Sequence, residues 1–139
     1  MSKRILVPLD GSEQSMEALQ FAADEWPDAE LTLLHVVNPA DATAGAEGGF
    51  PNAVEQWYSG ARERAESVLD EGAESVDRDV ETTIEVGRPA HTIVDVAEDE
   101  EFDQIVIGSH GRSGLQRVVL GSVAEGVIRK AEMPVTVVR

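Results

Sequence analysis

Five short apolar runs alternate along the chain with segments of helical periodicity, and this alternation constrains the fold more than any other feature. The apolar runs cover residues 4–9, 30–37, 81–86, 102–107 and 134–138. Apolar residues recur at helical spacing in the segments between them. The order βαβαβαβαβ predicts an α/β fold, with a doubly wound, five-stranded parallel sheet and helices on both faces. In such a sheet, ligands bind beyond the carboxyl ends of the strands, where the strand order reverses.

The fourth apolar run leads into a glycine-rich connection. Gly108, Gly111 and Gly114 follow the predicted strand, and Gly121 precedes a predicted helix that begins at Ser122. Glycines let the backbone approach an anion closely, and the free N–H groups of a helix's first turn attract phosphate. Neither the Walker pattern nor the Rossmann pattern is present. Ordinary turn chemistry remains an alternative, because Ser122 and Glu125 fit a capping box.

A second polar connection, Asp10-Gly11-Ser12, follows the first apolar run. Ser12 is a candidate N-cap for the next helix. Asp10 has two interpretations: a turn aspartate that organises this cap, or a carboxylate that accepts a ribose hydroxyl or holds a divalent cation. If the first and fourth strands are neighbours, both connections face one cleft.

The histidines form no obvious metal site. His35 in an apolar run and His91 on a predicted helix are more typical of structural residues than of ligands. His110 and Arg112, inside the glycine-rich connection, could neutralise phosphate charge.

In the last predicted helix, we expect Val127 and Ile128 to face the sheet.

The charge balance limits the possible partners. The 139 residues carry 27 acidic against 11 basic side chains, a net charge of −16. Such a surface repels nucleic acid and anionic membranes. It fits either a solubility surface or adaptation to a salt-rich cytoplasm. With no cysteine, no membrane span and no targeting segment expected, residues 1–139 are interpreted as one soluble cytoplasmic domain.

Two further segments carry expectations. Residues 38–52 are rich in Gly, Ala and Pro, and are interpreted as a loop that acts as a lid or a variable insertion. The last run is short and apolar, and at a sheet edge it would invite pairing with a second copy, so we expect a homodimer through the C-terminal strand.

Taken together, the chain resembles the universal stress protein family over essentially its whole length. The resemblance rests on the opening ILVPLDGSEQSMEAL, on the half from GRPAHTIVDV to the end, and on the spacing G-x2-G-x9-G-S/T at Gly108, Gly111, Gly121 and Ser122. That spacing is typical of members that bind ATP. The resemblance implies a sheet order 3-2-1-4-5, related to the adenine nucleotide alpha hydrolase fold, and dimerisation through the fifth strand.

The resemblance also implies roles for individual residues. Pro8 and Leu9 would line the nucleotide cleft, and the backbone near Val36 and Val37 would meet adenine. Asp10 would meet the ribose or the phosphate–metal region, where Mg or Mn accompanies the nucleotide, and Ile107 and Gly108 would border the ribose. The residues implied to hold phosphates are Gly111, Arg112, Gly121, Ser122 and Val123.

Three functional hypotheses follow. The first is an ATP-binding regulatory module in which nucleotide (ATP, ADP or AMP) orders the glycine loop and changes the surface offered to a partner. The second is a slow ATPase or self-phosphorylating enzyme, although no residue is evident that would position a water. The third is a nucleotide-free dimeric adaptor.

Overall fold

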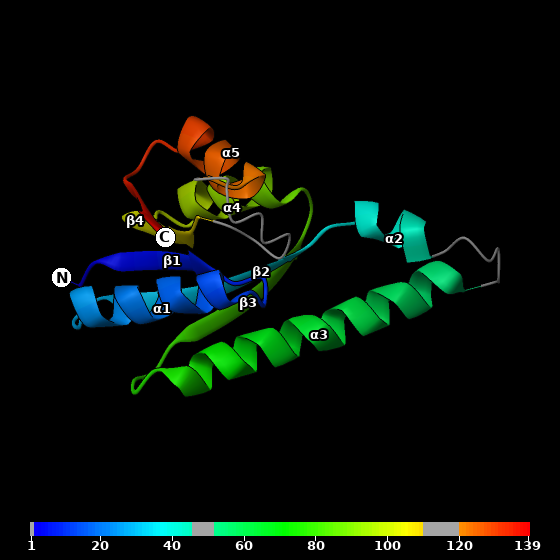
Figure 1. Cartoon of the computed structure of the whole chain (residues 1–139), viewed down its shortest axis with the longest axis horizontal. Helices are drawn as coiled ribbons and strands as arrows, with labels where there is room; N and C mark the ends of the chain where they lie inside the picture. The colour runs from blue at the N-terminus through cyan, green and yellow to red at the C-terminus, as the bar shows by residue number, and fades with distance from the viewer. Residues whose placement is uncertain (1, 46–51, 110–119) are drawn as a thin grey trace.

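The central feature of the fold is one parallel sheet. The computed structural model describes residues 2–45, 52–109 and 120–139, and in these residues the strand order is β3-β2-β1-β4-β5 (Figure 1). The strands are β1 (Arg4–Pro8), β2 (Glu30–Val37), β3 (Glu81–Val86), β4 (Gln104–Gly108) and β5 (Val135–Val138). The predicted α/β fold and the implied strand order are confirmed. The order reverses at β1, which pairs in parallel with both β2 and β4.

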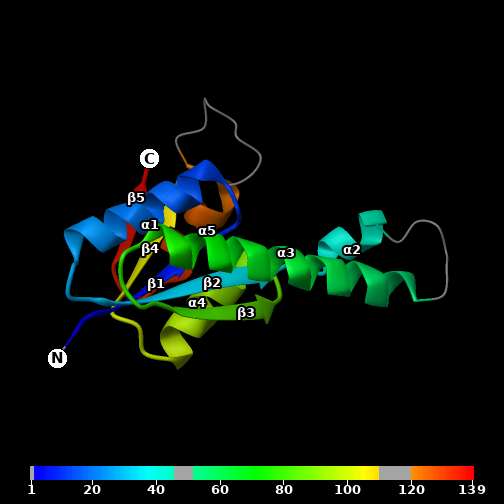
Figure 2. The ribbon, with the colours of Figure 1, turned by 90° about the horizontal axis from the view of Figure 1, so that it is seen from below.

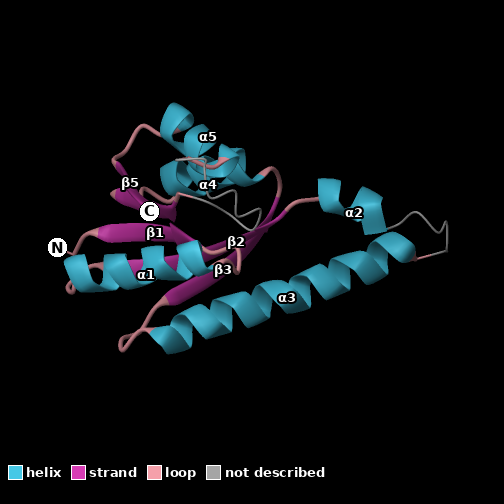
Figure 3. Cartoon of the chain, viewed as in Figure 1, coloured by secondary structure: helices cyan, strands magenta, loops and turns pink. Residues whose placement is uncertain are grey.

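Four of the helices cover the two faces of this sheet. The helices are α1 (Glu13–Glu25), α2 (Ala40–Gly45), α3 (Ala53–Ser75), α4 (Pro89–Asp99) and α5 (Ser122–Lys130). Helices α1 and α3 lie on one face, and α4 and α5 lie on the other (Figure 3). Helix α2 and the N-terminal half of α3 extend past the sheet in both perpendicular views (Figures 1 and 2).

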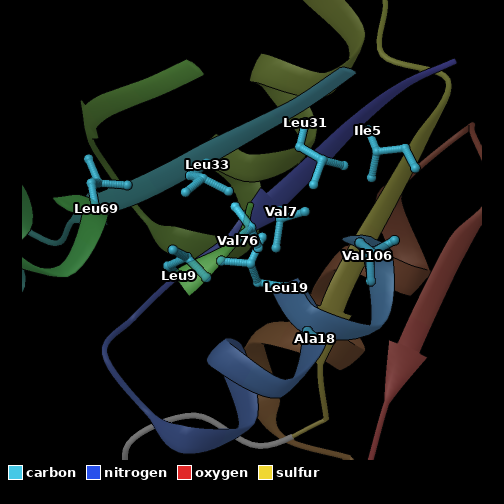
Figure 4. Packing of buried hydrophobic residues seen from close by; sticks show 11 residues of the cluster. Ile5, Val7, Leu9, Ala18, Leu19, Leu31, Leu33, Leu69, Val76 and Val106 are labelled. Carbon is cyan, nitrogen blue, oxygen red and sulfur yellow. The ribbon is translucent and has the colours of Figure 1, made fainter. Parts of the chain in front are cut away.

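The alternation of side chains along the strands builds a core on each face. In β1, Ile5 and Val7 point toward α1 and α3, while Leu6 between them points toward α4 and α5, and all three are fully buried. Figure 4 shows the first of these cores, with Leu19 of α1 among the strand residues. Because β1 is buried on both faces, its sequence is a continuous apolar run.

The two edge strands are more exposed than the central ones. In β3, both Glu81 and Glu85 are exposed, and no residue of the strand is buried. All four residues of β5 are half-buried. Charged side chains on an edge strand discourage pairing with other chains, so the two edges differ in how open they are to a partner.

Several element boundaries differ from the sequence-based prediction. Strand β1 ends at Pro8 rather than at residue 9, and β4 begins at Gln104 rather than at 102. Part of the predicted loop 38–52 is the short helix α2, and residues 46–51 lie outside the described residues. Ile128, expected to face the sheet, is 45% exposed. In the described ranges no helix has both the length and the apolar character needed to cross a membrane.

Candidate functional site

A cleft of about 540 Å³ opens at the carboxyl ends of β1, β2 and β4. Every described residue implicated by the sequence lines it. These residues come from the end of β1 (Pro8, Leu9 and Asp10), from β2 (Val36 and Val37), from β4 (Ile107 and Gly108) and from the start of α5 (Gly121, Ser122 and Val123). Gly111, Arg112 and His110 lie outside the described residues. The cleft sits at the reversal of strand order, where parallel sheets bind their ligands.

The β1–α1 connection is closed by its own side chains. The Oδ1 atom of Asp10 accepts the N–H of Ser12 at 2.9 Å, and Oγ of Ser12 accepts the N–H of Ser15 at 3.1 Å. Ser12 is therefore the N-cap of α1, as predicted. Gly11 between them has φ +88°, a conformation that glycine adopts without strain. Asp10 thus organises the cap, which is one of its two predicted roles.

The N-terminus of α5 differs from that of α1. Gly121, not Ser122, is the N-cap of α5, and no side chain of the described residues caps the helix. The predicted capping box is wrong: Ser122 already belongs to the first turn, and the carboxylate of Glu125 instead pairs with Arg129. Within the part of the chain that the structure describes, the N–H groups of Ser122, Val123 and Ala124 have no hydrogen-bond partner. All three residues line the cleft.

The end of β4 lies against the start of α1 at Gly108. A Cβ atom on Gly108 would lie 2.8 Å from the backbone oxygen of Gln14 in the first turn of α1. Contact with backbone leaves no side chain to move aside, so this position must be glycine for packing reasons alone. The close approach brings the end of β4 against the start of α1, and it explains Gly108 without a ligand.

His35 lines the cleft and positions the end of β1. Its Nδ1 lies 2.8 Å from the backbone oxygen of Leu9. A carbonyl oxygen only accepts, so Nδ1 carries the proton in this bond. The N–H of Leu9 in turn donates to the backbone oxygen of Leu34. The structural role expected for His35 is confirmed by this bond. Its partner, Leu9, directly precedes Asp10 in the chain.

One wall of the cleft comes from α3, which the sequence reasoning did not connect with the site. Trp57, Ala61, Arg64 and Val68 recur at helical spacing and all line the cleft. A Cβ atom on Gly11 would touch Val68 at 3.3 Å, so this wall adjoins the β1–α1 connection. The only sequence signal was the spacing itself, which does not indicate what a helix face contacts.

The arrangement suits an anion with an apolar part. The first turn of α5 offers backbone N–H groups and the positive end of a helix dipole. Val36, Val37 and Ile107 provide apolar surface in the same cleft. Asp10 is half-buried, and its Oδ1 is already used by Ser12. In the described ranges, no cluster of three or more His, Asp or Glu side chains is arranged to hold a metal ion.

This geometry agrees with the relatives of the chain. A profile described as "Universal stress protein family" matches residues 1–139. The chain belongs to the universal stress protein family. The universal stress protein MJ0531 of Methanocaldococcus jannaschii is 36% identical over 140 residues, covering 99% of this chain and 82% of the relative.

Two solved structures of similar proteins extend the comparison. The structure of MJ0577, also a universal stress protein of M. jannaschii, superposes with a TM-score of 0.83 at 35% identity, covering 99% of this chain and 96% of the other. A universal stress protein in complex with cAMP superposes with a TM-score of 0.63 at 25% identity, covering 99% of this chain and 97% of the other. The complex with cAMP shows that a member of this family binds an adenine nucleotide.

Proposed function

We propose that the protein binds ATP in the cleft and acts as a homodimeric, nucleotide-responsive regulatory module. The observation that carries the proposal is the N-terminus of α5, which no described side chain caps. Its first three residues line the cleft, and their N–H groups have no described partner. Such a helix end favours a phosphate group. The relative in complex with cAMP supports an adenine nucleotide as the ligand.

In this proposal the cleft divides into three regions. Adenine lies against Pro8, Leu9, Val36 and Val37. The ribose lies between Asp10 and the end of β4, at Ile107 and Gly108. The phosphates meet Gly121, Ser122 and Val123, together with Gly111 and Arg112 of the segment beyond the described residues.

A divalent cation fits the site only as a companion of the nucleotide. Mg²⁺ is usually bound through one or two carboxylates together with substrate phosphates and water. Asp10 has one carboxylate oxygen, Oδ2, that is not used by the cap, so it can supply one ligand. The remaining ligands would be phosphate oxygens and water. The cation would neutralise phosphate charge in a protein whose net charge is −16.

Calorimetry with ATP, ADP, AMP and adenosine, with and without Mg²⁺, tests the proposal. We expect saturable binding of ATP that is tighter with Mg²⁺ present. Absence of any binding at millimolar nucleotide would contradict it. Trp57 gives an independent signal: it lines the cleft, whereas Trp26, the other of the two tryptophans, lies at the C-terminal end of α1. A Trp26→Phe background therefore makes tryptophan fluorescence report on the cleft.

The homodimer is proposed through β5. This strand lies at the edge of the sheet, its four residues are half-buried, and it carries no charged side chain. Sedimentation velocity should give a species of twice the chain mass of 15.0 kDa. A monomer over the whole range of accessible concentrations would rule out this part of the proposal without affecting nucleotide binding.

A further inference from the structure

Arg64 of α3 is the one cationic side chain, arginine or lysine, among the described residues that line the cleft. It is exposed, and it has no hydrogen bond or ion pair with any other described residue. The side chains of Arg88 and Arg139 likewise have no described partner, but neither of them lines the cleft. The arginines with partners in the described chain are Arg4, Arg62, Arg78 and Arg129. Among the described residues, Arg64 therefore combines a guanidinium without a partner with a place in the cleft lining.

The position of Arg64 on α3 is set by neighbours that the structure fixes. Val68, one turn further along the same face, packs against the β1–α1 connection at Gly11. The guanidinium lies back along the helix, with Nη1 3.4 Å from the place that a Cβ atom on Gly60 would occupy. Helices α3 and α5 come from opposite faces of the sheet, so Arg64 and the α5 N-terminus approach the cleft from two sides.

The charge balance of the cleft indicates what the Arg64 side chain can do. The described lining contains two carboxylates, Asp10 and Asp41, and one guanidinium, so its formal charge is 1 − 2 = −1 with histidine neutral. A helix N-terminus contributes only about half of an elementary charge. A helix N-terminus can bind one phosphate group, whereas a di- or triphosphate carries additional negative charge that a guanidinium can pair with.

We propose that Arg64 binds the outer phosphates of the nucleotide and makes the cleft selective for ADP and ATP over AMP. The inference rests on the proposed function, since it concerns a nucleotide in the same cleft. The guanidinium presents a planar set of N–H donors that matches phosphate oxygens, which a single ammonium group cannot do. In this arrangement the α5 N-terminus holds the phosphate nearest the ribose, and Arg64 holds those beyond it.

The test compares Arg64→Gln with Arg62→Gln. Arg62 lies on the same helix two residues away, is paired with Glu66 at 3.6 Å, and does not line the cleft. Calorimetry would measure ATP, ADP, AMP and adenosine on the intact chain. For Arg64→Gln we expect ATP affinity to fall about tenfold and adenosine affinity to change by less than about twofold, with ADP between them. Arg62→Gln should leave all four affinities unchanged.

Salt and melting measurements complete the experiment. The difference between wild type and Arg64→Gln should shrink in high salt, because exposed charges are screened. Equal melting temperatures without ligand would show that both variants fold. If Arg64→Gln weakens all four ligands equally, or none of them, the inference is overturned while nucleotide binding stands. If the wild-type protein binds none of them, the proposed function fails and the inference fails with it.

Discussion

Helices α1 and α5 each follow one of two adjacent parallel strands, but the described residues cap their N-termini differently. Both follow adjacent parallel strands and both border the cleft. At α1, Ser12 caps the helix and Asp10 secures Ser12. At α5, Gly121 occupies the cap position and supplies no side chain. The α1 end is satisfied by a side chain, whereas among the described residues the α5 end has no side-chain cap.

The difference between the two helix ends assigns them different roles, stability at α1 and binding at α5. A capped N-terminus typically contributes about 1 kcal/mol to the free energy of unfolding. An uncapped one forgoes that contribution but leaves N–H groups that can bind an anion. Changes at the α1 end should therefore alter stability, and changes at the α5 end should alter nucleotide affinity.

Capping the N-terminus of α5 gives the largest expected effect. Gly121→Asp places a carboxylate at the N-cap of α5, where it can accept the N–H groups and repel phosphate. The backbone there, with φ −73° and ψ 164°, is accessible to any residue. We expect ATP affinity to fall about 100-fold and the free energy of unfolding to rise by about 0.5 kcal/mol.

The control for this change is Gly121→Asn, which caps the helix without adding a charge. By calorimetry it should lose about tenfold in ATP affinity, because only the competition for N–H groups remains. Unchanged ATP affinity in Gly121→Asp would remove the distinction between the two helix ends.

The contact between the end of β4 and the start of α1 gives the next largest effect. Gly108→Ala would force a Cβ atom to within 2.8 Å of the Gln14 backbone, and we expect it to lower the free energy of unfolding by about 2 kcal/mol. Urea denaturation measures this loss. In Gly60→Ala the new Cβ would meet only the Arg64 side chain at 3.4 Å. That control should instead stabilise α3 by up to about 1 kcal/mol. Similar results for both variants would argue against the close approach.

Removing the Ser12 cap of α1 should give a smaller effect, and it should lower stability rather than ATP affinity. Ser12→Ala removes the cap of α1, and we expect a loss of about 1 kcal/mol in urea denaturation with ATP affinity changed by less than about twofold. Ser59→Ala on the exposed part of α3 serves as the matched control, since Ser59 has no described partner. A large loss of ATP affinity in Ser12→Ala would mean that both helix ends serve the ligand.

The smallest effect is expected at Asp10. Asp10→Asn keeps an oxygen that can accept the N–H of Ser12 but removes the negative charge. Stability should change by only a few tenths of a kcal/mol, about the range of ordinary surface substitutions. If the free carboxylate oxygen meets the cation of the nucleotide, calorimetry should show a weaker dependence of ATP affinity on Mg²⁺. An unaltered Mg²⁺ dependence would assign Asp10 to the turn alone.

Much of this fold follows from the sequence, because hydrophobic periodicity is a local property. The bounds of β2 and β3 agree with the expected 30–37 and 81–86. The strand order did not follow from periodicity; it came from the family resemblance. Which strands become neighbours depends on packing between distant segments, and no local pattern encodes it.

The errors in the site have physical reasons as well. The spacing of Ser122 and Glu125 fits a capping box, yet the helix begins one residue earlier than that motif requires, and Gly121 takes the cap. Arg62 and Arg64 both lie off the buried face of α3. Residues two positions apart on a helix are separated by about 200° around its axis. Arg62 and Arg64 therefore flank the buried face on opposite sides. Periodicity distinguishes buried from exposed faces, but it does not tell which exposed flank meets a cleft.

The cleft draws its walls from residues as far apart in the chain as Pro8 and Ala124. No fragment of the chain contains it, so it exists only while the whole sheet is assembled. A ligand that occupies it adds its binding free energy to that of folding, about 2.7 kcal/mol at a concentration 100 times the dissociation constant. The thermal midpoint of the protein would then vary with the nucleotide level of its surroundings, and its resistance to proteolysis would vary in parallel.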